Sequence, residues 1–124
     1  ELRRGLSDLG CDTRYVQTVS DRRTPTYLKP RNTQNATLAG EYSRYDTKNR
    51  VRTRAATESA IIAASDAILP RIDALVIVDQ VEEADCGVVT AAVRQAVAER
   101  ARSWPQVVFW ADSRRRIGEF RRVI

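Results

Sequence analysis

The stretch that most constrains this chain is Asp73–Asp79, an uninterrupted run of apolar residues with an aspartate at each end. Such a run is typical of a strand covered on both faces, as in a parallel sheet. Thr90–Arg102 follows with helical spacing, and a second apolar run, Gln106–Ala111, ends just before Asp112. The order strand, helix, strand predicts a right-handed parallel crossover unit.

Two aspartates stand at the carboxyl ends of these predicted strands. In open parallel sheets, the carboxyl ends of the strands line the ligand crevice. We therefore expect Asp79 and Asp112 to share one rim, with Arg114 close by. The loop Gln80–Gly87 after the first strand is polar and acidic, as ligand-binding loops often are. The alternative is that both aspartates only end their strands in water.

Helical periodicity predicts a helix that starts near Ala55 and stops at Pro70. Thr57 is its predicted N-cap, and Thr90 is the predicted N-cap of the second helix. Three apolar residues of that second helix are spaced by fours and are predicted to face the core: Val93, Val97 and Ala101.

The chain divides by pattern into three parts. Residues 1–12 are interpreted as the end of a core helix that stops at Gly10. Residues 13–50 are interpreted as a β-strand lid or sheet-edge insert, because β-branched and aromatic residues alternate with polar stretches. Residues 51–124 are then the βαβ-containing part of an α/β core, incomplete at both ends. Strands of the insert are predicted at Tyr15–Val19, Thr24–Lys29 and Thr37–Tyr45.

Composition excludes several classes of function. The net charge of +5 raises the question of nucleic-acid binding. The basic residues, however, fall in small clusters interrupted by acids and without interleaved aromatics, which favours a solvated or phosphate-facing surface. With no histidine, and with Cys11 and Cys86 far apart, the sequence argues against a structural metal. No run suits a membrane span or a signal peptide, so we expect a cytoplasmic protein.

Five short motifs occur in a characteristic order: Leu9–Thr13, Thr24–Lys29, Arg44-Tyr45-Asp46, Asp73–Asp79 and Val108–Arg114. Together they resemble the ribokinase-like, or phosphofructokinase B, carbohydrate kinases, and among these the heptose-kinase-like sugar kinases. The resemblance spans nearly the whole chain. It implies an α/β fold with a partial three-layer α/β/α, Rossmann-type core of parallel strands and a small antiparallel β lid over the sugar.

The same resemblance implies the ligands and the residues that hold them. The substrate is a sugar or a sugar phosphate, the cofactors of the parent enzyme are ATP and Mg²⁺, and the lid pairs two copies in a homodimer. Arg114 is expected near the cofactor. Substrate binding is expected from seven residues: Thr24, Thr26, Lys29, Arg44, Asp46, Asp79 and Asp112.

The chain also departs from the family pattern. Where heptose kinases carry an Asp-Tyr-Gly-Lys-Gly type of turn, this chain has Asp79-Gln80 and a longer acidic loop, so the identity of the sugar stays open. The family's Asn-x-x-Glu and Gly-Ala-Gly-Asp motifs and its glycine-rich start are absent. The Gly-Ala-Gly-Asp motif supplies the catalytic base and an anion hole. We therefore expect a fragment of a kinase that has no catalytic residue and is inactive alone.

Two other classes of function remain open from the sequence. One is a non-catalytic α/β binding or dimerisation module that uses the β-unit as an interaction edge. The other is a phosphate-sensing α/β domain with Asp79 as acceptor, although the further acidic residues and the lysine of such a site have no matching positions.

Overall fold

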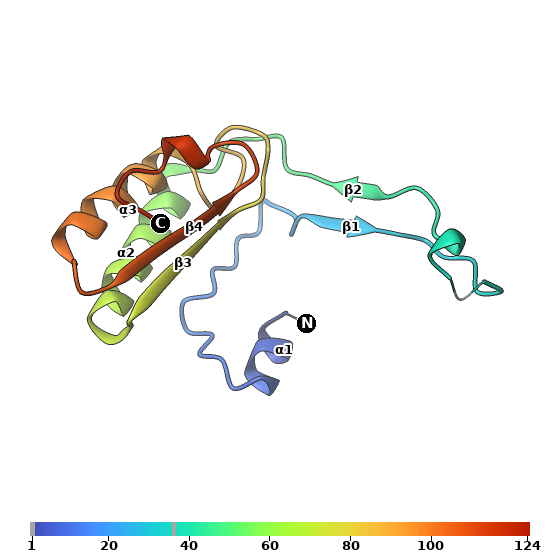
Figure 1. The fold of residues 1–124 in the computed structure, drawn as a ribbon, viewed down its shortest axis with the longest axis horizontal. Helices are drawn as coiled ribbons and strands as arrows, with labels where there is room; N and C mark the ends of the chain where they lie inside the picture. Colours follow the sequence, from blue (N-terminus) through green and yellow to red (C-terminus); the bar gives the residue numbers. More distant parts are fainter. Residues whose placement is uncertain (1, 36) are drawn as a thin grey trace. The chain divides into compact units, whose positions relative to one another are not determined.

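The computed structural model describes residues 2–35 and 37–124, and these form two compact units. The first combines the chain up to Val19 with Val51–Ile124, and the second is Ser20–Arg50. Helices and parallel strands make up the first unit, and an antiparallel hairpin makes up the second (Figure 1). The chain is therefore a mixed α/β protein, as the sequence predicts.

The centre of the first unit is a parallel pair of strands, β3 (Ala74–Asp79) and β4 (Val108–Ser113). Their register runs from Ala74 opposite Val108 to Asp79 opposite Ser113. The sequence placed β4 two residues too early. The amide of Val107 instead donates to the carbonyl of Trp104, which closes a turn before the strand begins.

Two helices connect and cover this pair. Helix α2 (Ala55–Ile68) leads through the 3₁₀ turn η2 (Leu69–Arg71) into β3, and α3 (Ala91–Ser103) links β3 to β4. Thr90 is the N-cap of α3, as predicted, because its hydroxyl accepts from the amide of Val93 at 3.3 Å.

The predicted N-cap of α2 is wrong. Arg54 has extended φ and ψ angles of −70° and 146°, and its carbonyl already accepts from the amides of Thr57 and Glu58. Thr57 therefore lies inside the first turn. Glu58, also in that turn, stands near the positive end of the helix dipole.

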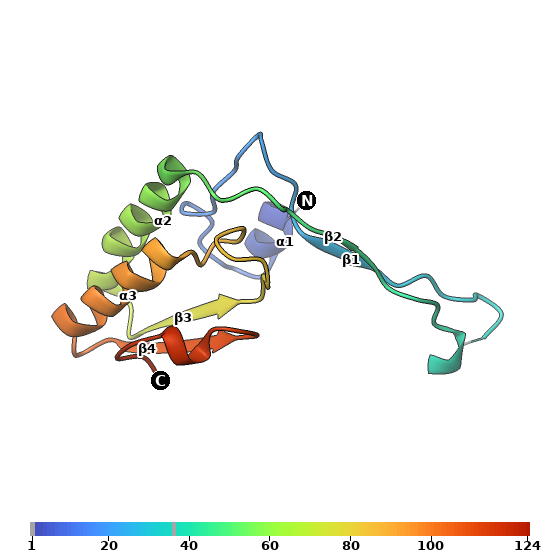
Figure 2. The same ribbon diagram turned by 90° about the horizontal axis from the view of Figure 1, so that it is seen from above.

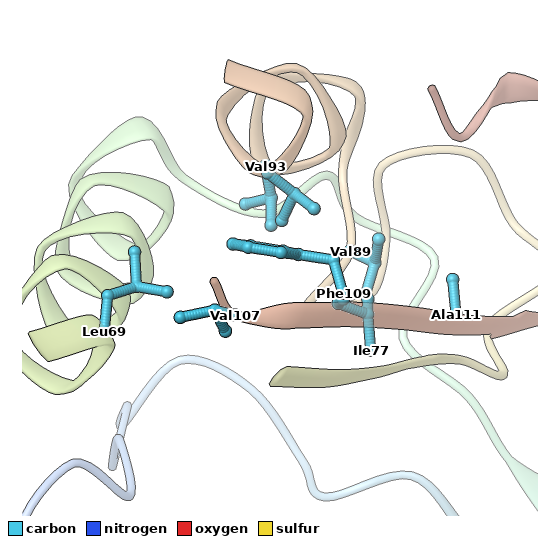
Figure 3. Packing of buried hydrophobic residues seen from close by; sticks show 8 residues of the cluster. Leu69, Ile77, Val89, Val93, Val107, Phe109 and Ala111 are labelled. Carbon is cyan, nitrogen blue, oxygen red and sulfur yellow. The ribbon is translucent and has the colours of Figure 1, made fainter. Parts of the chain in front are cut away.

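The hydrophobic core lies between the two helices and one face of the strands (Figures 2 and 3). In both strands, alternate residues point to that face and are buried or half-buried. The buried members of the core are Leu69, Ile77, Val89, Val93, Val97, Val107, Phe109 and Ala111. Val93 and Val97 confirm the predicted core face of α3, and Ala101 packs against it half-buried.

The opposite face of the strand pair is open within the described residues. Val76, Val78, Val108 and Trp110 expose 58%, 55%, 49% and 44% of their surface. Within the described residues only one face of the strand pair is covered, because α2 and α3 pack on the same side (Figure 2). The continuous apolar run of β3 suggests full burial in sequence, but of its apolar residues Ile77 is buried, Leu75 is half-buried and the others are exposed.

An ion pair joins the two helices at their outer surface. The Arg100 guanidinium donates to both oxygens of Asp66, from Nε at 2.8 Å and from Nη2 at 2.7 Å. Hydrogen bonding to Arg100 lowers the pKa of Asp66, and the same bonds raise the pKa of Arg100.

The two ends of the first unit differ from each other. Helix α1 (Leu2–Asp8) is short and has no buried residue. The predicted strand Tyr15–Val19 is wrong, because Val16 donates to the carbonyl of Thr13 in a turn. At the other end, Ile124 donates to Phe109 at 2.9 Å and accepts from Ala111 at 2.8 Å, the hydrogen-bond pattern of a parallel partner for β4.

The second unit is a hairpin of β1 (Thr26–Leu28) and β2 (Tyr45–Thr47). The strand predicted at Thr37–Tyr45 is wrong: the 3₁₀ turn η1 (Leu38–Gly40) occupies its start, and the amide of Thr37 donates to the Asn35 side chain. Every residue of both strands is exposed, so β1 and β2 bury no side chain.

Candidate functional site

The carboxyl ends of β3 and β4 place Asp79 and Asp112 side by side but on opposite faces of the strand pair. Asp79 lies opposite Ser113, and Asp112 lies opposite Val78. Residues that lie opposite each other share a face, and neighbouring residues of one strand point to opposite faces. Asp112 precedes Ser113, the partner of Asp79, by one residue, so its carboxylate lies on the other face from that of Asp79. Asp79 faces the helices and is 3% exposed, whereas Asp112 is exposed on the open face.

Asp79 belongs to a buried ion-pair cluster. Its carboxylate accepts from the Ser113 hydroxyl at 2.7 Å and from Arg116 Nη1 at 3.3 Å. The side chains of Asp79 and Arg116 are only 2% and 10% exposed. Arg116 also donates to the carbonyls of Val81 and Glu82. The Asp79 charge is therefore compensated inside the protein, and its cluster fastens the loop after β3 to the segment after β4.

Asp112 belongs to a second, exposed group that we call the rim triad: Asp112, Gln80 and Arg114. The side chain of Gln80 donates from Nε2 to Asp112 Oδ2 at 2.8 Å, and Arg114 Nε donates to Gln80 Oε1 at 2.7 Å. Asp112 Oδ1 and both terminal nitrogens of Arg114 make no hydrogen bond within the described residues. In the rim triad, the side-chain amide of Gln80 thus lies between the carboxylate of Asp112, an anionic acceptor, and the guanidinium of Arg114, a cationic donor.

The acidic loop between β3 and α3 is held in place by two hydrogen bonds from Thr53. Thr53, which is buried, donates from its amide to the Asp85 carbonyl and from its hydroxyl to the Gly87 carbonyl, both at 2.7 Å. A side chain at Gly87 would place its Cβ 2.8 Å from that of Val81. Asp85 has a φ of 57°, in the left-handed region that aspartate tolerates better than most residues. The loop therefore has a defined shape.

The start of α3 points toward this rim but is satisfied by the chain itself. Asp85 Oδ1 accepts from the Ala91 amide at 2.8 Å, and the Thr90 hydroxyl accepts from Val93. Amides at a helix start are a common phosphate site. Here a carboxylate and a hydroxyl of the protein take two of them.

The other five predicted substrate-binding residues belong to the second unit. Arg44, just before β2, forms a bidentate ion pair with Asp46 on β2, with both contacts at 2.7 Å. Lys29, just after β1, pairs with Glu41 at 3.1 Å. Thr26 lies on β1 and Thr24 two residues before it. The structure thus brings Arg44 and Asp46 together and leaves Thr26 opposite Thr47, away from them.

Sequence reasoning missed Ser113, Arg116 and Thr53. Arg116 looked like one more member of the solvated cluster Arg114–Arg116, and nothing in its neighbours signals that it turns inward. Ser113 had a usable signal: the alternation of Phe109, Ala111 and Ser113 places it on the buried face. Thr53 gave none, since its partners lie on a loop more than thirty positions away.

The described residues contain no group of three histidine, cysteine, aspartate or glutamate side chains arranged to hold a metal ion. No helix in residues 2–35 and 37–124 combines the length and apolar character needed to cross a membrane. The chain matches no protein-family model, no curated protein and no solved structure.

Proposed function

We propose that the chain is the lid and central core of an ATP-dependent carbohydrate kinase of the ribokinase-like type, with the full-length protein transferring the γ-phosphoryl group to a hydroxyl of a sugar or sugar phosphate. The observation that carries the proposal is the rim triad at the carboxyl end of a parallel strand pair. Ligands of open α/β sheets bind at that end. The five family-like motifs of the sequence supply the reaction class.

The rim triad has the chemistry to position a sugar. Asp112 accepts hydrogen bonds from hydroxyls, and the terminal nitrogens of Arg114 suit an anionic phosphate, whether on the sugar or on the nucleotide. Such positioning and charge stabilisation make up most of phosphoryl-transfer catalysis. Gln80 holds the two ions in a fixed relation.

The sequence predicts that Asp79 binds substrate, but in this proposal it has a supporting role. Its carboxylate is already engaged by Ser113 and Arg116 and nearly inaccessible, so it does not fit as a ligand of Mg²⁺. We assign it to supporting the rim rather than to contacting the sugar. The catalytic base and the phosphate-cradling residues belong to other parts of the proposed parent enzyme, which we expect in the cytoplasm.

The open face of the strand pair supports the three-layer core. Parallel strands are almost always covered on both faces, and here four large apolar residues of the second face are exposed: Val76, Val78, Val108 and Trp110. We propose that a second helical layer of the parent enzyme packs on them. The backbone hydrogen bonds of Ile124 to β4 support a further parallel strand of the sheet at the edge of β4.

A second candidate function has one observation in its favour. Leu28 and Tyr45 are cross-strand neighbours, and each exposes 64% of its surface. A short hairpin with an exposed apolar pair suits an interaction edge, so a non-catalytic binding or dimerisation module is the alternative.

The test is a panel of sugars and sugar phosphates with the full-length protein, ATP and Mg²⁺. The variant Asp112→Asn removes the negative charge of the rim triad, and Asp73→Asn, at the opposite end of β3, is the matched control. We expect Asp112→Asn to raise KM for the accepted sugar about tenfold or more, as loss of a charged hydrogen bond does, and Asp73→Asn to change it little. If no member of the panel is phosphorylated by the wild type, the kinase proposal is wrong.

A further inference from the structure

A cleft of about 490 Å³ lies between helix α3 and the segment that follows β4. We call it the arginine cleft. Its walls are Ala91, Arg94, Gln95, Ala98, Glu99 and Arg102 of α3 and, from the other segment, Glu119 and Arg121. A volume of this size is in the range of small-molecule sites. None of these residues belongs to the rim triad, so the cleft is a separate feature of the parallel unit.

The segment that forms the second wall is held in place at three points. Glu119 forms an ion pair with Arg94 at 2.6 Å. Phe120 packs half-buried against the hydrophobic core, and the backbone of Ile124 is hydrogen-bonded to β4. Arg121 lies between the last two of these attachments. The cleft therefore has two defined walls.

Both carboxylates that line the cleft already have a cationic partner. Glu119 is paired with Arg94, whose side chain is only 10% exposed. Glu99 lies 3.8 Å from Arg100 and also accepts from the side-chain amide of Gln95 at 3.2 Å. The negative charge of the cleft is thus compensated by residues of α3 itself.

Two guanidinium groups of the cleft, by contrast, have no partner. Arg102, in the last turn of α3, and Arg121 are exposed and make no hydrogen bond or ion pair within residues 2–35 and 37–124. A guanidinium presents five N–H donors in a planar arrangement that matches the oxygens of a phosphate or a carboxylate. The cleft therefore has the capacity to bind an anion.

The lining favours a small phosphorylated molecule over a peptide. Its only apolar members are Ala91 and Ala98, so it offers no pocket for the large side chains that anchor most protein contacts. A phosphate group carries up to two negative charges and several acceptor oxygens, which two guanidinium groups can share. The volume of the cleft leaves room for the organic part of such a molecule.

We propose that the arginine cleft binds the phosphate group of a small molecule, with Arg102 and Arg121 donating to its oxygens. Glu119 acts as an internal competitor in this site, because its carboxylate occupies the third guanidinium, that of Arg94. The site is independent of the proposed kinase function, since it shares no residue with the rim triad and needs no phosphoryl transfer.

The experiment titrates the full-length protein with inorganic phosphate at constant ionic strength and follows the Nε–H signals of Arg102 and Arg121 by NMR. Both signals should shift along one saturable curve. Arg102→Gln and Arg121→Gln, each read on the remaining signal, should raise the apparent Kd about fivefold or more, as loss of charged hydrogen bonds does. Arg115→Gln removes the same charge from an exposed residue outside the cleft and should leave the Kd within about twofold.

Glu119→Gln should have the opposite effect. It removes the competing carboxylate and leaves the Arg94 guanidinium to the ligand, so the Kd for phosphate should fall about threefold or more. Glu58→Gln makes the same change in net charge on α2, outside the cleft, and should leave the Kd within about twofold. Equal effects of these two variants would mean that net charge, and not the cleft, determines the binding of phosphate.

The remaining outcomes are equally distinct. Absence of a saturable shift, or equal weakening in Arg102→Gln, Arg121→Gln and Arg115→Gln, would overturn the site. A short polyglutamate peptide that binds more tightly than phosphate, with the same dependence on Arg102 and Arg121, would overturn the small ligand in favour of an acidic protein segment.

Discussion

The two units of this chain achieve order by opposite means. In the parallel unit, β3 and β4 are each six residues long and bury alternate side chains against two helices. In the hairpin, β1 and β2 are each three residues long and bury no side chain, and the described side-chain contacts near them are ion pairs and a ring contact. Isolated two-stranded hairpins are marginally stable in water. The parallel unit, which we call the frame, therefore has a packed core, and we expect the hairpin to be the less stable of the two.

The largest effect should come from emptying the frame's core. Phe109 is 4% exposed, so Phe109→Ala should lower the free energy of unfolding by about 3 to 5 kcal/mol. Leu28→Ala in the hairpin should cost about 0.5 kcal/mol or less. Urea denaturation is followed by tryptophan fluorescence for the first unit, where Trp104 and Trp110 lie, and by far-UV circular dichroism for the whole chain, and comparable losses for the two variants would contradict this contrast.

The buried ion pair should come next. Arg116→Ala leaves the Asp79 carboxylate buried without its countercharge, which should cost about 3 kcal/mol. Arg115→Ala is the matched control, because that side chain is 66% exposed and 3.6 Å from Glu82, and exposed pairs contribute about 1 kcal/mol or less. Equal unfolding free energies for both variants would mean that Arg116 is not needed to compensate Asp79.

Capping should have an intermediate effect on the frame. Thr90→Ala removes the acceptor for the Val93 amide and should cost about 1 kcal/mol. Thr57→Ala replaces a residue inside α2 and should cost close to nothing, since alanine is the better helix former. A larger loss at Thr57 than at Thr90 would place the start of α2 further along the chain than the structure does.

The smallest effect should be the pH dependence of the Asp66–Arg100 pair. Arg100 lowers the pKa of Asp66 in the folded state, so the pair stabilises the protein above the ordinary carboxyl pKa of 3.8. That contribution is lost as pH falls through the lower folded pKa. Because the pair is half-exposed, we expect Asp66→Asn to cost about 0.5 kcal/mol at neutral pH and to match the wild type at the acid end. A difference in unfolding free energy between Asp66→Asn and the wild type that grows toward acid pH would contradict the lowered pKa of Asp66.

The contrast between the units also explains what the sequence could predict. Segments that contribute to the core carry apolar patterns, so β3 followed from its apolar run, and α3, its cap at Thr90 and its core positions Val93 and Val97 followed from helical spacing. Residues 13–50 carry no such period, since almost nothing in them is buried. Two of the three strands predicted there, Tyr15–Val19 and Thr37–Tyr45, were therefore read from β-branched residues that in fact lie in turns and irregular backbone.

The candidate site was predictable in position but not in geometry. Both aspartates lie at strand ends, as expected, but their faces depend on a register that only the pairing of β3 with β4 fixes. The partners Arg116 and Gln80 depend on contacts between segments more than thirty residues apart. No local pattern records such contacts.

Hydrogen exchange of the backbone amides tests the central claim most directly. The amides of β1 and β2 should exchange far faster than those of β3 and β4, because local opening of a hairpin whose strands bury no side chain needs little free energy. Amides of β1 and β2 that exchange as slowly as those of β3 and β4 would contradict the claim.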